Sequence, residues 1–153
     1  MSDAHKLSLA VQYASEMENI PTRAQFRRWA QRALLQDVQV ALRIVDEAEG
    51  RELNRSYRGK DYATNVLTFT YDEAQSPLYG DVVICAPVVA REARAQHKEL
   101  HARYAHLMVH AMLHLQGHEH EGEQEAAEME QLETAILAKL GYADPYVVTS
   151  ETE

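Results

Sequence analysis

Residues 64–89 read TNVLTFTYDEAQSPLYGDVVICAPVV, and this stretch predicts the class of fold. Its first eight residues, up to Tyr71, are rich in β-branched and aromatic side chains, as is typical of a strand. The polar segment around Pro77 indicates a turn, and a second strand is expected from Tyr79 to Cys85. Because Pro87 suits the first turn of a helix, this second strand should lead directly into one.

The rest of the chain shows further strand and helix patterns. Apolar and polar residues alternate in two segments, and helical spacing or glycine stops mark the additional helices. The predicted strands span 7–13 and 38–45, and the predicted helices span 22–36, 99–116 and 123–140, with a short helix within 46–58. This order indicates one α+β domain over residues 1–153, with a small mixed four-stranded sheet covered by helices.

The composition favours a cytoplasmic protein. The chain has 153 residues, of which 46% are apolar and 25% are charged, so it is long enough to bury a core. The first six residues are polar, so no secretory leader is expected, and the longest apolar run, Val82 to Ala90, is too short to span a bilayer. Cys85 is the only cysteine, which excludes an intrachain disulfide. We therefore expect no membrane partner.

The charge of the chain is unevenly distributed. The formal net charge is −9, and the segment from His118 onward carries ten acidic residues and one lysine, so the rest of the chain is balanced. An acidic protein is not expected to bind a duplex tightly and nonspecifically, and DNA is not an expected partner. A local basic groove remains compatible with this balance.

A histidine-rich segment predicts a metal site. Residues 106–120 read HLMVHAMLHLQGHEH. His110 and His114 are four apart, so on a helix both imidazoles project from one face and can bind one zinc ion. Gly117 can adopt a positive φ and reverse the chain, which would bring His120 back as a third ligand. We therefore expect one zinc ion per chain. Three imidazole ligands leave its fourth coordination position to water, as in catalytic sites.

The same segment is similar to the zinc signature of metzincin peptidases, HExxHxxGxxH, so a metzincin-like zinc helix is expected. In those enzymes the glutamate after the first histidine is the general base. Ala111 stands at that position here, and alanine takes up no proton. The sequence therefore disfavours a peptidase.

The chain more closely resembles the YbeY family of bacterial metal-dependent endoribonucleases. The zinc segment of that family reads HGxLHLxGYDH, and the three ligand histidines are unchanged, whereas Ala111, His118 and Glu119 replace Gly, Tyr and Asp. Thr70 stands where the family often has proline. The other matching stretches, in the order of the family, lie within 53–61, 64–69, 79–85, 129–133 and 140–146.

The resemblance implies cleavage of single-stranded RNA, maturation of the 16S rRNA 3′ end and a part in ribosome quality control, with the ribosome or its assembly factors as partners. It also implies that Arg58 is catalytic. A guanidinium can hold two phosphate oxygens and stabilise the charge that develops on a reacting phosphodiester. The alternative is that Arg58 is a surface residue paired with Asp61.

The roles of the neighbouring residues stay open. Zinc would activate a water molecule or polarise a phosphoryl oxygen, but no general base is identifiable, and His118 and Glu119 are the only nearby candidates. Asp81 would orient a ligand histidine or cap a turn. The glutamates between residues 119 and 133 are interpreted as a solvated helix face.

The RNA is expected along the predicted strand of residues 67–71, where Phe69 or Tyr71 would stack a base. For Phe69, packing in the core is the favoured interpretation.

Two other functions and two other ligands are kept as alternatives. One function is a zinc-dependent hydrolase of peptides or another small substrate. The other is a noncatalytic ribosome-assembly factor, in which His118 as a fourth ligand would close a structural zinc site. His106, which falls on the same helical stripe as His110, is the nearest competitor as a ligand.

Overall fold

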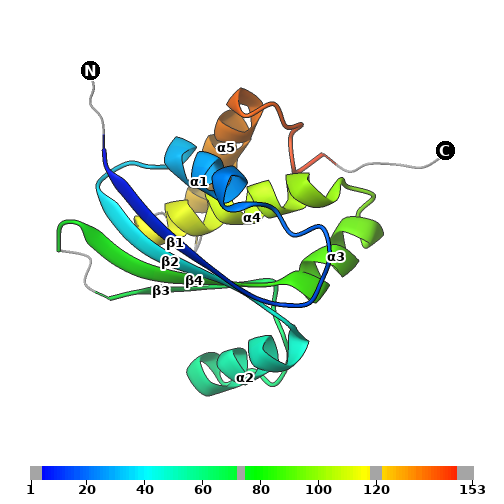
Figure 1. The fold of residues 1–153 in the computed structure, drawn as a ribbon. Coiled ribbons are helices and arrows are strands. Elements are labelled where there is room, and N and C mark those ends of the chain that lie inside the picture. Colours follow the sequence, from blue (N-terminus) through cyan, green and yellow to red (C-terminus); the bar gives the residue numbers. More distant parts are fainter. Residues whose placement is uncertain (1–4, 72–74, 118–121, 148–153) are drawn as a thin grey trace.

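The structure is a computed structural model that describes residues 5–71, 75–117 and 122–147. Within these residues the fold combines one sheet with five helices (Figure 1). The elements in chain order are β1 (Leu7–Ala14), α1 (Arg23–Arg32), β2 (Val38–Val45), α2 (Glu47–Arg58), β3 (Val66–Thr70), β4 (Leu78–Cys85), α3 (Ala86–Ala95), α4 (Leu100–Leu115) and α5 (Glu123–Lys139). This order confirms the predicted α+β class.

The sheet is mixed, as predicted, and its strand order is β1-β2-β4-β3. The strands β1, β2 and β4 run parallel, which requires crossover connections, whereas β3 pairs antiparallel with β4. This arrangement leaves β3 at one edge of the sheet. The predicted strand of residues 64–71 is shorter in the structure, because only Val66 to Thr70 pair with β4 as a regular strand.

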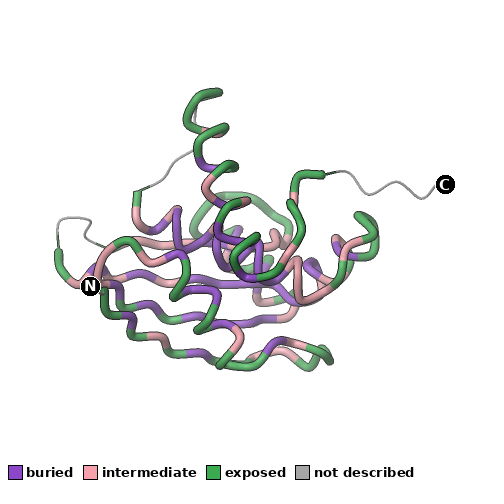
Figure 2. The backbone as a smooth tube through the Cα atoms, turned by 90° about the horizontal axis from the view of Figure 1, so that it is seen from above, coloured by how far each residue is buried: buried purple, intermediate pink, exposed green. Residues whose placement is uncertain are grey.

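The two faces of the sheet are covered unequally. Helices α1, α3, α4 and α5 lie on one face, and α2 alone lies on the other (Figure 1). The larger core, to which Leu42 and Ile44 of β2 contribute, lies under the four helices. A smaller cluster faces α2 and consists of Val45, Leu67, Val83, Cys85 and Val88. Seen from above, the buried residues gather where the helices cross the strands (Figure 2).

The N-terminus of α1 follows from its sequence, but its C-terminus does not. Thr22 accepts a hydrogen bond from the backbone N–H of Gln25, whose side chain bonds back to Thr22, which is a capping box. The prediction of a helix through Gln36 was wrong, because α1 ends at Arg32. The side chain of Gln116 accepts the backbone N–H groups of Leu35 and Gln36, at 2.7 and 3.2 Å, and so holds this segment outside the helix.

Within the residues that the structure describes, no helix is both long enough and apolar enough to cross a membrane.

Candidate metal centre

Two of the predicted ligands lie together on α4. His110 and His114 are one turn apart, and their rings are nearly parallel, with centroids 6.4 Å apart and an interplanar angle of 7°. Most residues of α4 are buried, so the helix is fixed inside the larger core while both histidines remain partly exposed. The structure therefore brings this pair together as the spacing predicts.

A buried carboxylate of α5 holds the ring of His110. The Glu133 side chain is fully buried, and its Oε2 atom lies 2.6 Å from His110 Nδ1. Because a carboxylate only accepts hydrogen bonds, this contact places the His110 proton on Nδ1. Nε2 is then the ring nitrogen whose lone pair suits a metal, and such carboxylate–histidine pairs are usual behind zinc ligands. The donor set and its support fit a zinc ion.

His106 is a partner in this network and does not resemble a third ligand. The guanidinium of Arg103 donates to His106 Nδ1 at 3.1 Å, so Nε2 carries the proton and points to Glu133 Oε1 at 3.0 Å. Both ring nitrogens are thus engaged by protein groups. The alternative of His106 as a metal ligand does not fit this geometry.

Three donors surround the Glu133 carboxylate. Burial alone would raise the pKa of Glu133, but hydrogen bonds from His106, His110 and Tyr146 outweigh it and lower the pKa to about 2. Tyr146 lies in the segment after α5 and donates its hydroxyl to Glu133 Oε1. Burial, together with this carboxylate, raises the pKa of Tyr146. The network therefore ties α4, α5 and the segment after α5 into one unit.

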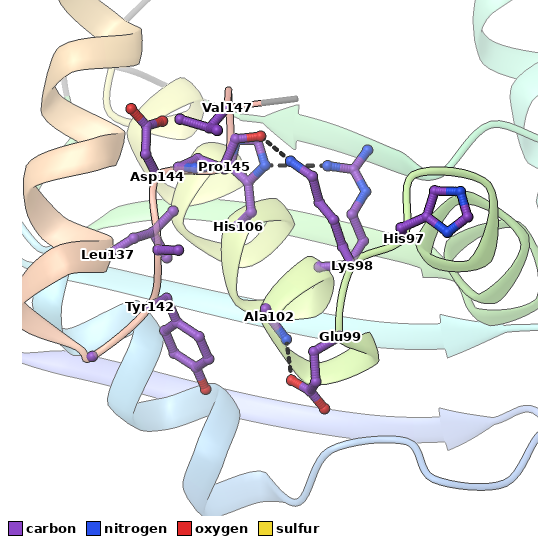
Figure 3. A pocket seen from close by; sticks show the side chains of 13 residues that line it. His97, Lys98, Glu99, Ala102, His106, Leu137, Tyr142, Asp144, Pro145 and Val147 are labelled. Carbon is purple, nitrogen blue, oxygen red and sulfur yellow. Dashed lines mark hydrogen bonds between the residues drawn. The ribbon is translucent and has the colours of Figure 1, made fainter. Parts of the chain in front are cut away.

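A cavity adjoins His106 (Figure 3). It has a volume of about 370 Å³ and is bounded by the start of α4, the end of α5 and the segment around Pro145. Lys98 crosses it and donates a hydrogen bond to the Pro145 carbonyl. A separate, smaller cavity of about 110 Å³ adjoins His110, Glu133 and Tyr146. His106 and Glu133 thus form the wall between the larger cavity and the predicted metal ligands.

The chain turns back after His114 as the sequence predicts. Gly117 has a φ of +102°, a conformation that glycine adopts without strain. After the turn, α5 returns beside α4 and brings Ala126 and Glu133 to His110. The predicted ligand His120 and the candidates His118 and Glu119 lie outside the described residues. Among residues 5–71, 75–117 and 122–147, no three His, Cys, Asp or Glu side chains are placed to hold a metal ion.

Arg58 lies at the C-terminal end of α2, on the other side of β3 from α4. Its Nη2 atom donates to the Thr68 carbonyl at 3.4 Å, and the side chain is exposed. The alternative pairing with Asp61 is not the one observed, because Asp61 accepts two hydrogen bonds from Arg51, at 2.8 and 3.0 Å. The guanidinium of Arg58 thus points to the edge strand.

The role of Glu133 was not predicted. The interpretation of the glutamates up to residue 133 as a solvated face is wrong for Glu133, which is buried. Asp81 was a candidate either for orienting a ligand histidine or for capping a turn. Asp81 instead accepts the Tyr71 hydroxyl. A signal was present: Glu133 follows Met129 by four residues and precedes Ile136 by three, so it falls on the apolar stripe of α5.

Known proteins are similar to this chain over most of its length. The family model described as Endoribonuclease YbeY matches residues 10–141. A protein named Endoribonuclease YbeY from Aromatoleum aromaticum is 60% identical over 144 residues, covering 92% of this chain and 93% of that protein. One of the same name from Methylobacillus flagellatus is 55% identical over 141 residues, covering 92% and 94%.

A solved structure shares the fold. The solution structure of TM1509 from Thermotoga maritima is similar with a TM-score of 0.55 and 22% identity, covering 90% of this chain and 99% of that one. Because the family model spans most of the chain, and relatives more than half identical match nearly all of it, the chain belongs to the YbeY endoribonuclease family.

Proposed function

We propose that this protein is a zinc-dependent endoribonuclease that cleaves single-stranded RNA. The observation that carries the proposal is the fully buried Glu133 carboxylate, which holds His110 through Nδ1 and so presents Nε2 on the same side of α4 as His114. A helix that had no metal to bind would gain little from burying a charge behind a partly exposed histidine. The relatives are named endoribonucleases, and we take RNA as the proposed substrate from that name.

The zinc ion would be held by His110, His114 and His120. The positive φ of Gly117 and the return of α5 beside α4 support the assignment of His120, because the chain turns after His114 and comes back to His110 at Ala126. Bound there, zinc would supply a Lewis acid for hydrolysis of a phosphodiester. Glu133 fixes the orientation and tautomer of His110, and Tyr146 and His106 keep the carboxylate ionised and in place.

Arg58 binds the scissile phosphate in this proposal. Its neighbours Arg51 and Arg55 are each paired with a carboxylate, Asp61 and Glu52, whereas Arg58 bonds a backbone carbonyl. The charge of Arg58 is therefore less compensated, and its planar fork suits two phosphate oxygens. The biological substrate that we propose is the 3′ end of 16S rRNA, with the ribosome and its assembly factors as partners in the cytoplasm.

The two alternatives are less well supported. A peptidase of the metzincin type needs a base where Ala111 stands, and Ala111 is fully buried in the core. A structural zinc site would need a fourth protein ligand, for which His118 is the candidate. Spectroscopy of the bound metal distinguishes the two arrangements, because a catalytic site retains a water ligand.

The first test of the proposal compares paired and unpaired substrates. We expect the zinc-loaded protein to cleave a labelled single-stranded RNA and to leave the same RNA largely intact once it is annealed to its complement. The reason is that a flexible strand can bring its phosphate to the site, whereas a rigid duplex of high charge density is repelled by the net charge of −9. Faster cleavage of the duplex would refute the substrate assignment. Equal cleavage by a His114→Ala preparation would reveal a contaminating nuclease.

A second prediction concerns Glu133. We expect Glu133→Gln to weaken zinc binding by about 10- to 100-fold, as is typical when the group behind a ligand histidine is changed. The two histidines donate to different oxygens of the carboxylate, so in the glutamine variant one N–H would face an NH2 group, and we also expect a loss of about 1–3 kcal/mol in the free energy of unfolding. Competition with a chromogenic chelator measures the affinity, and thermal unfolding measures the stability.

The matched control is Glu128→Gln on the exposed side of the same helix. Zinc affinity should be unchanged there. If Glu133→Gln bound zinc as tightly as the parent, the carboxylate would have no part in positioning His110.

A further inference from the structure

The face of the sheet that carries α2 is only partly covered. On this face the exposed residues of β1 and β2 are small or polar, namely Ser8, Ala10, Gln12, Gln39 and Ala41. Helix α2 lies across one part of the face, and the strands extend beyond it (Figure 1). Some proteins bind single-stranded RNA on a sheet surface of this kind, where aromatic side chains stack with the bases.

Beside α2, this face forms a groove of about 340 Å³. Three aromatic side chains line it: Tyr57 from α2, and Phe69 and Tyr71 from β3. The rings of Tyr57 and Phe69 meet edge to face, with centroids 5.2 Å apart. Tyr57 and Tyr71 expose 68% and 67% of their surface, so most of each ring is not used for packing. This volume lies within the range of small-ligand sites.

The charged side chains at the floor of the groove, Arg43, Glu49 and Asp81, are each held by a neighbouring side chain. Arg43 forms two hydrogen bonds with Glu49, at 2.6 and 3.0 Å, and Asp81 accepts the Tyr71 hydroxyl. An uncharged group with polar edges, such as a nucleobase, fits a floor of this kind better than a charged group or an apolar helix. Arg58, the residue after Tyr57, lies at the rim, where its guanidinium bonds the edge strand.

The groove and the metal helix meet the same part of β3 from opposite faces. Phe69 and Thr70 pair with Asp81 and Gly80 of β4. Leu115 of α4 packs closely on Gly80, since a Cβ placed on this glycine would lie 2.8 Å from Leu115 Cδ2 and 3.1 Å from the Phe69 carbonyl oxygen. Leu115 directly follows the predicted ligand His114. The end of α4 that carries His114 therefore packs against the pair of strands whose other face forms the groove.

From these contacts we infer that the groove binds one unpaired nucleotide of the RNA substrate, the one next to the scissile phosphate, with its base stacked against Tyr57 and Tyr71 and that phosphate on Arg58. The inference rests on the proposed endoribonuclease function and extends it. It assigns the preference for single strands to this groove, because a base in a duplex is not available for stacking on a protein ring. It also gives Phe69 a supporting role beneath Tyr57.

The test measures binding and cleavage separately. Fluorescence anisotropy of a labelled oligouridine is recorded with the zinc-loaded protein at low temperature and short times after mixing, before cleavage, and a gel of the same samples confirms that the RNA is still intact. We expect Tyr57→Leu to weaken binding by about 5- to 150-fold, the range of one base–aromatic stack, and Tyr57→Phe to bind like the parent. The matched control is Tyr62→Leu, because Tyr62 is also exposed near the end of α2 but does not line the groove.

The salt dependence separates stacking from charge. Tyr57→Leu should leave the slope of log affinity against log salt unchanged, whereas Arg58→Ala should reduce it by about 0.7, the value for one phosphate contact on a single strand. Equal binding by the parent and Tyr57→Leu, with RNA cleavage intact in the parent, would overturn the inference and leave the groove to another occupant, such as a protein. If the parent neither bound nor cleaved RNA, the proposed function would fall, and this inference with it.

Discussion

Replacing His114 with alanine is expected to remove both the zinc and the activity. A structural zinc site with four ligands contributes about 10–16 kcal/mol, so one ligand accounts for about 3 kcal/mol, or about two orders of magnitude in affinity. After dialysis we expect about one zinc per chain in the parent and almost none in the variant. Metal content by atomic absorption and RNA cleavage by gel measure the two effects.

A control on the same helix makes this result specific. His101 lies in the first turn of α4 and contacts the Asn19 carbonyl and Gln25, so His101→Ala should lower stability slightly and leave the zinc content unchanged. Added zinc should raise the unfolding temperature of the parent and of His101→Ala, because the ligand binds only the folded state. The same rise in His114→Ala would show that His114 is not a ligand.

Replacing Arg58 with alanine is expected to lower kcat by about 10²- to 10³-fold, the usual cost of removing one group that stabilises charge in a transition state. Zinc content should not change, because Arg58 lies across β3 from α4. Stability should change by no more than about 0.5 kcal/mol, since the side chain is exposed. Arg58→Lys should recover part of the activity, because lysine keeps the charge but lacks the fork.

The matched control is Arg55→Ala, one turn earlier on α2. Arg55 is exposed, like Arg58, and it is paired with Glu52. Its loss should therefore leave kcat close to that of the parent. Single-turnover cleavage at saturating RNA separates the chemical step from binding. If Arg58→Ala cleaved RNA at the rate of Arg55→Ala, Arg58 would be a surface residue without a part in catalysis.

Most of the fold could be predicted because its signals are local. The alternation along Val38 to Val45 and the Thr22–Gln25 capping box each depend on a few neighbouring residues, and they place an element without knowledge of the rest. The C-terminus of α1 could not be predicted in this way. It depends on Gln116, which is 80 residues away in the chain from Gln36 and becomes its neighbour only in the folded state.

In the candidate site, too, local features could be predicted from the sequence and contacts between distant parts of the chain could not. The spacing of His110 and His114 is a property of one helix, so it could be predicted from the sequence, and so could the positive φ of Gly117. The support of the site depends on tertiary packing. A glutamate within an acidic segment looks solvated by composition. Its place on the apolar stripe of α5 indicates burial, but only the packing of α5 against α4 shows that Glu133 contacts His110.

The order in which the chain is synthesised determines when the network around Glu133 can be completed. A ribosome makes the chain from its N-terminus, and a domain generally folds as a unit. His110 and His114 are therefore made before Glu133, and Glu133 before Tyr146, the residue that completes the network around the carboxylate. A nascent chain that has exposed only α4 has a pair of histidines whose tautomers and ring orientations are not yet fixed. The nuclease site that we propose thus matures only late in translation.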